Sequence, residues 1–117
     1  MALPVTKNLA IYKGDTYKFS FRLKEQSGAQ NYVDLTGCTA KAEIRPDHDS
    51  ETVLVEFTTE VPTQTGDDLG RVNLSLTPTE TSAAASGVWD VQLTWPDGMV
   101  KTYLAGSVVV TKEVTRV

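Results

Sequence analysis

Strict alternation between apolar and polar residues is the feature that most constrains how this chain can fold. It is clearest from Thr16 to Lys24, where Tyr17, Phe19, Phe21 and Leu23 are separated by polar or charged residues. A period of two places the apolar side chains on one face of a half-buried β-strand. Similar patterns predict further strands at residues 38–45, 53–61, 70–76 and 88–95. Segments next to turns predict strands at 8–12 and 99–104, and a run that is apolar on both faces predicts one at 107–111.

Turn-forming residues separate these segments. Pro46 ends one strand because proline has no amide hydrogen for a β-ladder. The sequence Trp95-Pro96-Asp97-Gly98-Met99 is typical of a hairpin, and Ala105-Gly106 predicts a β-bulge. Thr77-Pro78-Thr79-Glu80 has the hydroxyl, proline and glutamate of a helix start, which predicts one short helical turn near residues 78–85.

Together these signals predict an all-β protein: an immunoglobulin-like antiparallel β-sandwich of seven or eight strands. At 117 residues the chain has room for one core, so we expect a single domain over residues 1–117. Trp89 and Trp95 lie on the same face of one alternating strand. Both side chains are therefore expected to point into that core and anchor it. Residues 1–7 precede the first clear strand and are a possible N-terminal arm.

Composition excludes several classes of protein. Cys38 is the only cysteine, so an internal disulfide and a thiolate metal cluster are ruled out, and we expect a small buried side chain there. The net charge of −4 argues against nucleic acid as the main partner. Because no apolar run approaches the roughly 18 residues of a membrane span, we expect a soluble protein without a membrane partner.

The sequence contains no catalytic motif that we can assign. His48 lies between Asp47 and Asp49, but three adjacent polar residues favour a solvated loop over a metal site. Carboxylate pairs such as Glu56 and Glu60 are expected on solvated faces. We therefore predict no enzyme activity and no cofactor. Five cations would form a basic stripe only if their strands pair: Lys18, Arg22, Lys24, Lys41 and Arg45.

Motifs in both halves of the chain suggest a family. The first half contains residues 8–16 with their Gly14-Asp15 turn and the segment Val33-Asp34-Leu35-Thr36-Gly37. These resemble the N-terminal domain of phage baseplate upper proteins, a group of small structural proteins of tailed bacteriophages. The second half is similar to short members of that group, with a Gly-x-Trp-Asp strand, a Pro-Asp-Gly hairpin and a Val-Thr-Lys-Glu-Val-Thr-Arg tail.

The resemblance implies a non-enzymatic virion structural protein that is assembled in the bacterial host cytoplasm. It implies a tail-tip or baseplate assembly or adaptor component first, and capsid decoration as the alternative. The partners would be other virion proteins, with a homo-oligomer as a further possibility. Leu3, Pro4 and Val5 are the candidate partner interface. Long family members continue into trimerising or receptor-binding segments, so receptor binding does not follow for this chain.

A carbohydrate-binding module is the alternative from another class. Sandwiches can display aromatic side chains on which sugars stack, and the candidates here are Tyr12, Tyr32, Tyr103 or a tryptophan. Buried tryptophans and no glycan binding would argue against this interpretation, whereas an exposed aromatic row would favour it.

Overall fold

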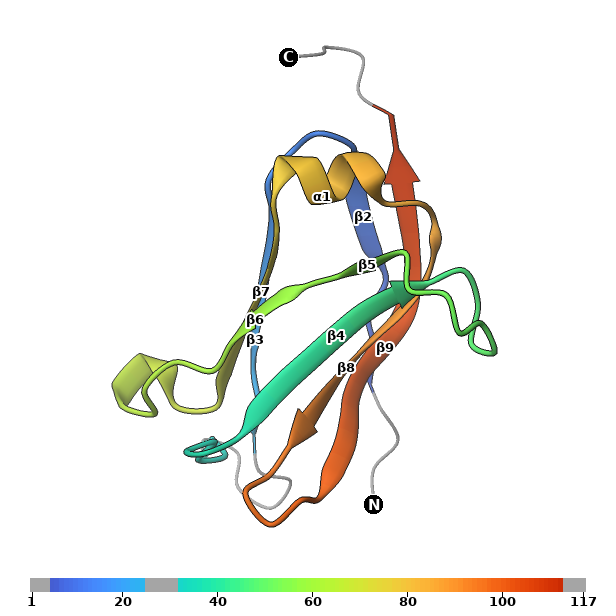
Figure 1. Ribbon diagram of the computed structural model, residues 1–117. Helices are drawn as coiled ribbons and strands as arrows, with labels where there is room; N and C mark the ends of the chain where they lie inside the picture. The colour runs from blue at the N-terminus through green and yellow to red at the C-terminus, as the bar shows by residue number, and fades with distance from the viewer. Residues whose placement is uncertain (1–4, 25–31, 113–117) are drawn as a thin grey trace.

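The computed structural model describes residues 5–24 and 32–112, which form two β-sheets packed against each other (Figure 1). The all-β sandwich is thereby confirmed. The described residues contain nine strands: β1 (Val5–Thr6), β2 (Leu9–Tyr12), β3 (Tyr17–Arg22), β4 (Thr39–Arg45), β5 (Val55–Glu56), β6 (Thr58–Glu60), β7 (Arg71–Leu76), β8 (Gly87–Thr94) and β9 (Val100–Thr111). They also contain a 3₁₀ turn, η1 (Gly66–Asp68), and one α-helix, α1 (Pro78–Ala83).

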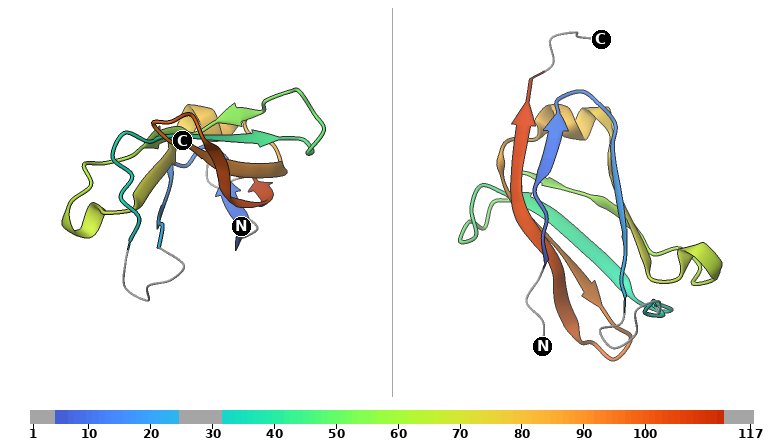
Figure 2. Two further views of the ribbon diagram at one scale, coloured as in Figure 1. Left: turned by 90° about the horizontal axis from the view of Figure 1, so that it is seen from below. Right: turned by 180° about the vertical axis from the view of Figure 1, so that it is seen from behind.

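Strand order identifies the sandwich as immunoglobulin-like. The larger sheet has the order β1-β9-β8-β4-β5, with β2 also paired to β9, and the smaller sheet has the order β3-β7-β6. Thus β4, β8 and β9 take the places of strands C, F and G of an immunoglobulin domain, and β3, β7 and β6 those of B, E and D. Figure 2 shows the two sheets from below and from behind.

The first two strands depart from the predicted antiparallel arrangement, because β1 and β2 run parallel to β9. Val5 pairs with Leu104 and Leu9 pairs with Val108, so the register is unchanged across the gap between β1 and β2. Residues 5–12 therefore act as one edge strand. At the gap, the indole nitrogen of Trp89 donates a hydrogen bond to the Lys7 carbonyl at 2.7 Å.

This pairing also bears on the possible N-terminal arm. Val5 and Thr6 form β1, and the Lys7 amide donates to the Ala105 carbonyl at 2.9 Å. Residues 5–7 therefore lie along the edge of the larger sheet. The rest of the predicted arm, residues 1–4, lies outside the described residues.

Two strand boundaries differ from the prediction. The segments 99–104 and 107–111 form one long strand, β9. The bulge lies at Tyr103 instead of Ala105-Gly106. Val91 pairs with Leu104 and Gln92 pairs with Thr102, which leaves Tyr103 without a partner on β8. The segment 53–61 divides into β5 and β6, which belong to different sheets. Such short strands explain why the described residues contain nine strands rather than seven or eight.

The core lies between the sheets, as the alternation predicts. β7 contributes Val72, Leu74 and Leu76 from the smaller sheet, and β8 contributes Trp89, Val91 and Leu93 from the larger one. Trp89 is only 2% exposed, and its ring meets that of Phe19 edge-on at 6.1 Å between centroids. The core role of Trp89 is confirmed. Trp95 is half-buried and packs against the core.

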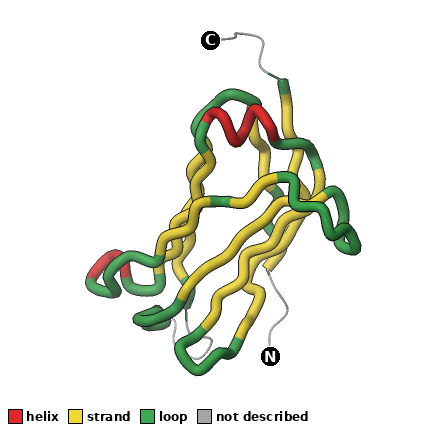
Figure 3. The backbone as a smooth tube through the Cα atoms, viewed as in Figure 1, coloured by secondary structure: helices red, strands yellow, loops and turns green. Residues whose placement is uncertain are grey.

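The helix α1 connects β7 to β8 and confirms the predicted helical turn (Figure 3). Its capping box is formed, since the Glu80 amide donates to the Thr77 hydroxyl and the Thr77 amide donates to the Glu80 carboxylate. The buried Thr81 hydroxyl accepts a hydrogen bond from the Gly14 amide at 3.0 Å and donates to the Asp15 carbonyl at 2.8 Å. Helix α1 is thereby attached to the turn between β2 and β3.

Candidate functional site

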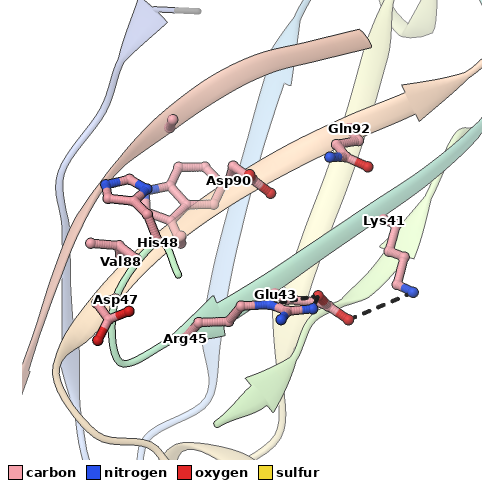
Figure 4. Close-up of a pocket in the computed structure, with 10 residues that line it drawn as sticks. Lys41, Glu43, Arg45, Asp47, His48, Val88, Asp90 and Gln92 are labelled. Atoms are coloured by element: carbon pink, nitrogen blue, oxygen red, sulfur yellow. Dashed lines mark hydrogen bonds and ion pairs between the residues drawn. The ribbon is translucent and has the colours of Figure 1, made fainter. Parts of the chain in front are cut away.

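The outer face of the larger sheet carries a polar groove, which we call the β4–β8 groove. It has a volume of about 370 Å³ (Figure 4). Alternation along β4 sends Ala42 and Ile44 into the core and leaves the residues between them facing outwards. The groove is lined by Lys41, Glu43, Arg45, Asp47, His48, Val88, Trp89, Asp90, Gln92 and Ala105.

A row of three carboxylates crosses this face. Glu43 on β4 lies directly opposite Glu56 on β5 on one side and directly opposite Asp90 on β8 on the other. The next residue in the row is Ala105 on β9, whose side chain is a single methyl group. Like charges directly opposite one another in a sheet are destabilising, so this row has an energetic cost unless cations compensate it.

The two cations on β4 both bind the central carboxylate. The Arg45 guanidinium reaches Glu43 at 2.8 Å, and the Lys41 ammonium reaches it at 3.6 Å. The hydrogen bond from Arg45 is the main reason why the pKa of Glu43 is lowered from its ordinary value. Arg45 also donates to the Ser50 carbonyl at 2.8 Å, which holds its side chain in place.

Asp90 is different, because its carboxylate has no hydrogen bond or ion pair to any other described residue. Burial raises the pKa of Asp90 above its ordinary value, and the charge of Glu43 raises it further. In Figure 4 the dashed lines join Glu43 to Lys41 and Arg45, while Asp90 stands apart on β8. The groove therefore holds a half-buried carboxylate that has no partner within residues 5–24 and 32–112.

The loop after β4 closes one end of the groove. Pro46 follows β4, and the Asp47 carboxylate accepts a hydrogen bond from the Asp49 amide at 2.9 Å. His48 is exposed and lines the groove with Asp47. In the described ranges, 5–24 and 32–112, no group of three or more His, Cys, Asp or Glu residues is arranged to hold a metal ion.

An apolar patch lies on the same outer face, further along β9. Val109 is 57% exposed and pairs with Ala10 on β2, and Tyr12 at the end of β2 is 55% exposed. Both strands alternate, so Val109 and Tyr12 point to the same side of the sheet as Ala105. We call Ala10, Tyr12 and Val109 the Tyr12–Val109 patch.

The possible basic stripe does not form. Lys18 and Arg22 lie on β3 in the smaller sheet, whereas Lys41 and Arg45 lie on β4 in the larger sheet, and these two strands do not pair. Lys24 forms an isolated bridge with Tyr32.

Of the candidate interface residues, only Val5 is described. It lies in β1 and is 64% exposed, whereas Leu3 and Pro4 lie outside the described residues.

Sequence reasoning did not single out Asp90 or its position opposite Glu43, because that position depends on the register of β4 against β8.

The aromatic candidates for sugar stacking do not form one exposed row. The Arg22 guanidinium lies 3.5 Å from the ring centroid of Tyr32, and the Lys101 ammonium lies 5.2 Å from that of Tyr103. Tyr12 lies at the end of β2.

Cys38 is buried, and burial raises the pKa of its thiol, as expected for a small core residue.

Neither a family model nor a curated protein matches the sequence of this chain. Among the described residues, none of the helices has the length and apolar character to cross a membrane.

Proposed function

We propose that this chain is a non-enzymatic structural protein of a tailed-phage particle that acts as a tail-tip or baseplate assembly or adaptor component. The observation that carries the proposal is the resemblance of its motifs to phage baseplate proteins. These motifs occur in both halves of the chain, at the Gly14-Asp15 turn, at Asp34-Leu35-Thr36-Gly37 and at the Pro96-Asp97-Gly98 hairpin.

The fold is compatible with an adaptor. A rigid sandwich can present one sheet face to a neighbour while its core remains unchanged. The outer face of the larger sheet combines the β4–β8 groove with the Tyr12–Val109 patch, so it offers both polar and apolar contacts. We assign contact with other virion proteins to this face.

Purified particles of the phage that encodes the chain provide the test. Mass spectrometry of whole particles, and of separated tails and capsids, should detect the chain in the tail fraction. Cross-linking should then join it to a tail-tip or baseplate protein. Recovery with capsids instead would favour the decoration alternative, and absence from particles would contradict both.

Solution binding gives a second discriminator. The purified chain should form a stable complex with isolated tail-tip proteins, which light scattering would detect as a change in mass. Specific binding to a glycan panel, with no binding to particle proteins, would instead favour a carbohydrate-binding module.

A further inference from the structure

We propose that the β4–β8 groove receives an arginine side chain from a neighbouring protein and that the Asp90 carboxylate accepts its guanidinium. Only the identity of the neighbour as a virion protein rests on the proposed function. The groove, its charge and its unpaired carboxylate are features of the described residues themselves.

The first step of the argument is the charge of the groove. Its lining contains three carboxylates, on Glu43, Asp47 and Asp90, and two basic side chains, Lys41 and Arg45. Both cations bind Glu43. Asp90 lies opposite Glu43 and is repelled by it, while Arg45 and His48 attract Asp90 without forming an ion pair with it. A cation supplied from outside would pair Asp90 and relieve this repulsion.

The second step is the choice of cation. The described residues offer no arrangement of three ligands for a metal ion, whereas one carboxylate is sufficient to bind a guanidinium through two parallel hydrogen bonds. Gln92 lies two residues from Asp90 on the same face of β8 and can accept another N–H from its amide oxygen. Val88 and Ala105 line the groove beside Asp90 and can contact the methylene stem of an arginine.

The third step is the surrounding surface. Val109 lies four residues beyond Ala105 on β9, which corresponds to about 13 Å along an extended strand. One interface of ordinary size would therefore cover the groove together with the Tyr12–Val109 patch. Tyrosine and arginine side chains are enriched in the energetically important part of an interface, and Tyr12 with an arginine in the groove would supply both. The expected partner surface is an arginine flanked by apolar residues.

Ethylguanidinium chloride, which mimics the arginine side chain, is the probe for the first experiment. Titration into the isotope-labelled chain, at an ionic strength matched with NaCl, should cause saturable NMR shifts at Asp90, Gln92 and Ala105. Apparent binding should weaken about tenfold in Asp90→Asn, since a hydrogen bond to a charged group is lost. Ethylammonium chloride should bind more weakly than ethylguanidinium.

Asp67→Asn is the matched control, because Asp67 is exposed on η1 and the substitution removes the same charge away from the groove. It should leave the titration unchanged. Equal shifts in wild type and Asp90→Asn, or equal loss in both variants, would overturn the proposal. Equal affinity for the two probes would overturn the choice of arginine.

The second experiment uses whole particles. A phage from which the gene for this chain has been deleted is supplied with the wild-type chain, Asp90→Asn, Asp90→Lys or Asp67→Asn. The amount of the chain in purified particles is then measured. We expect Asp90→Lys to be depleted most, Asp90→Asn to be depleted less, and Asp67→Asn to match wild type. Equal incorporation of all variants would refute the groove contact and leave the virion role intact. Wild type missing from particles would refute the virion role, while the probe titration still tests the groove.

Discussion

The charged form of the Asp90 carboxyl destabilises the folded protein, and the surroundings of the side chain explain why. Burial makes the largest contribution to the raised pKa of this carboxyl, and Glu43 on β4 adds to it. Arg45 on β4 and His48 in the following loop act in the opposite direction, and Ala105 on β9 is uncharged. A carboxyl whose pKa is raised by folding binds its proton more tightly in the folded state. The folded state therefore loses stability as the pH rises from the ordinary carboxyl pKa through the raised pKa.

The Asp90→Asn variant should consequently be more stable than wild type at neutral pH, by roughly 0.2–1 kcal/mol, the usual range for a like-charge pair directly across a sheet. Near pH 3 the two proteins should be almost equally stable, since Asp90 is then protonated and uncharged. Urea unfolding at both pH values measures this difference, with Asp67→Asn as the control. A variant less stable than wild type at neutral pH would contradict our account of the unpaired carboxylate.

Gly106 allows the N-terminal edge strand to lie close to β9. A Cβ atom at this position would come within 2.2 Å of the Lys7 carbonyl oxygen, the same atom that accepts the hydrogen bond from the Trp89 indole. The Lys7 carbonyl oxygen therefore cannot move away from a Cβ atom at residue 106 without disturbing its hydrogen bond to Trp89.

We therefore predict that Gly106→Ala destabilises the protein by about 1–3 kcal/mol, the usual cost of overpacking. Chemical denaturation measures the loss, and the fluorescence of Trp89 should change because its hydrogen bond is displaced. Ser107→Ala, at the exposed neighbouring position, is the control and should have little effect. Unchanged stability in Gly106→Ala would show that the edge strand is not held through Lys7.

At the scale of elements, helix α1 and the β2–β3 turn depend on each other through Thr81. Thr81→Val keeps the shape of the side chain but leaves the partly buried Gly14 amide without its acceptor. We expect a loss of about 1–3 kcal/mol, the desolvation cost of an unsatisfied polar group. Thermal unfolding measures it, and hydrogen exchange should be faster at Gly14. Thr79→Val, an exposed position on the same helix, should be much milder.

Local sequence patterns predict the elements whose signals are complete within a few residues. Alternation identifies β3, β7 and β8, and the Thr77–Glu80 capping box identifies the start of α1. Pairing partners are not encoded locally. The parallel pairing of β2 with β9 joins residues about a hundred positions apart, and short apolar segments do not show which neighbour they will meet.

The candidate site shows the same limit. Glu43 and Asp90 each occupy an ordinary outward position of an alternating strand, and nothing near either residue indicates the other. Their opposition follows from the register of β4 against β8. Likewise, Val53 to Val61 has one continuous pattern, yet the strand crosses from one sheet to the other at Phe57.

At the scale of the whole molecule, the parallel edge has a mechanical consequence. In Figure 1 β2 and β9 both run towards the upper end of the molecule, where β9 ends. Because Val5 pairs with Leu104 and Tyr12 pairs with Thr111, residue 5 and residue 112 lie at opposite ends of the parallel pair. Tension applied between residues 5 and 112 would therefore pull the two strands in opposite directions along their length. The hydrogen bonds between residues 5–12 and 104–111 would be loaded in shear, all at once, instead of opening one after another.

We expect a high rupture force when single molecules are stretched through attachments at residues 5 and 112. Attachments at residues 5 and 97 should give a clearly lower force, because both then lie at the same end of the parallel pair and the strands peel apart progressively. Equal forces in the two geometries would contradict this reasoning. A chain with such an edge can transmit tension along its long axis while its sheet faces remain available for contact.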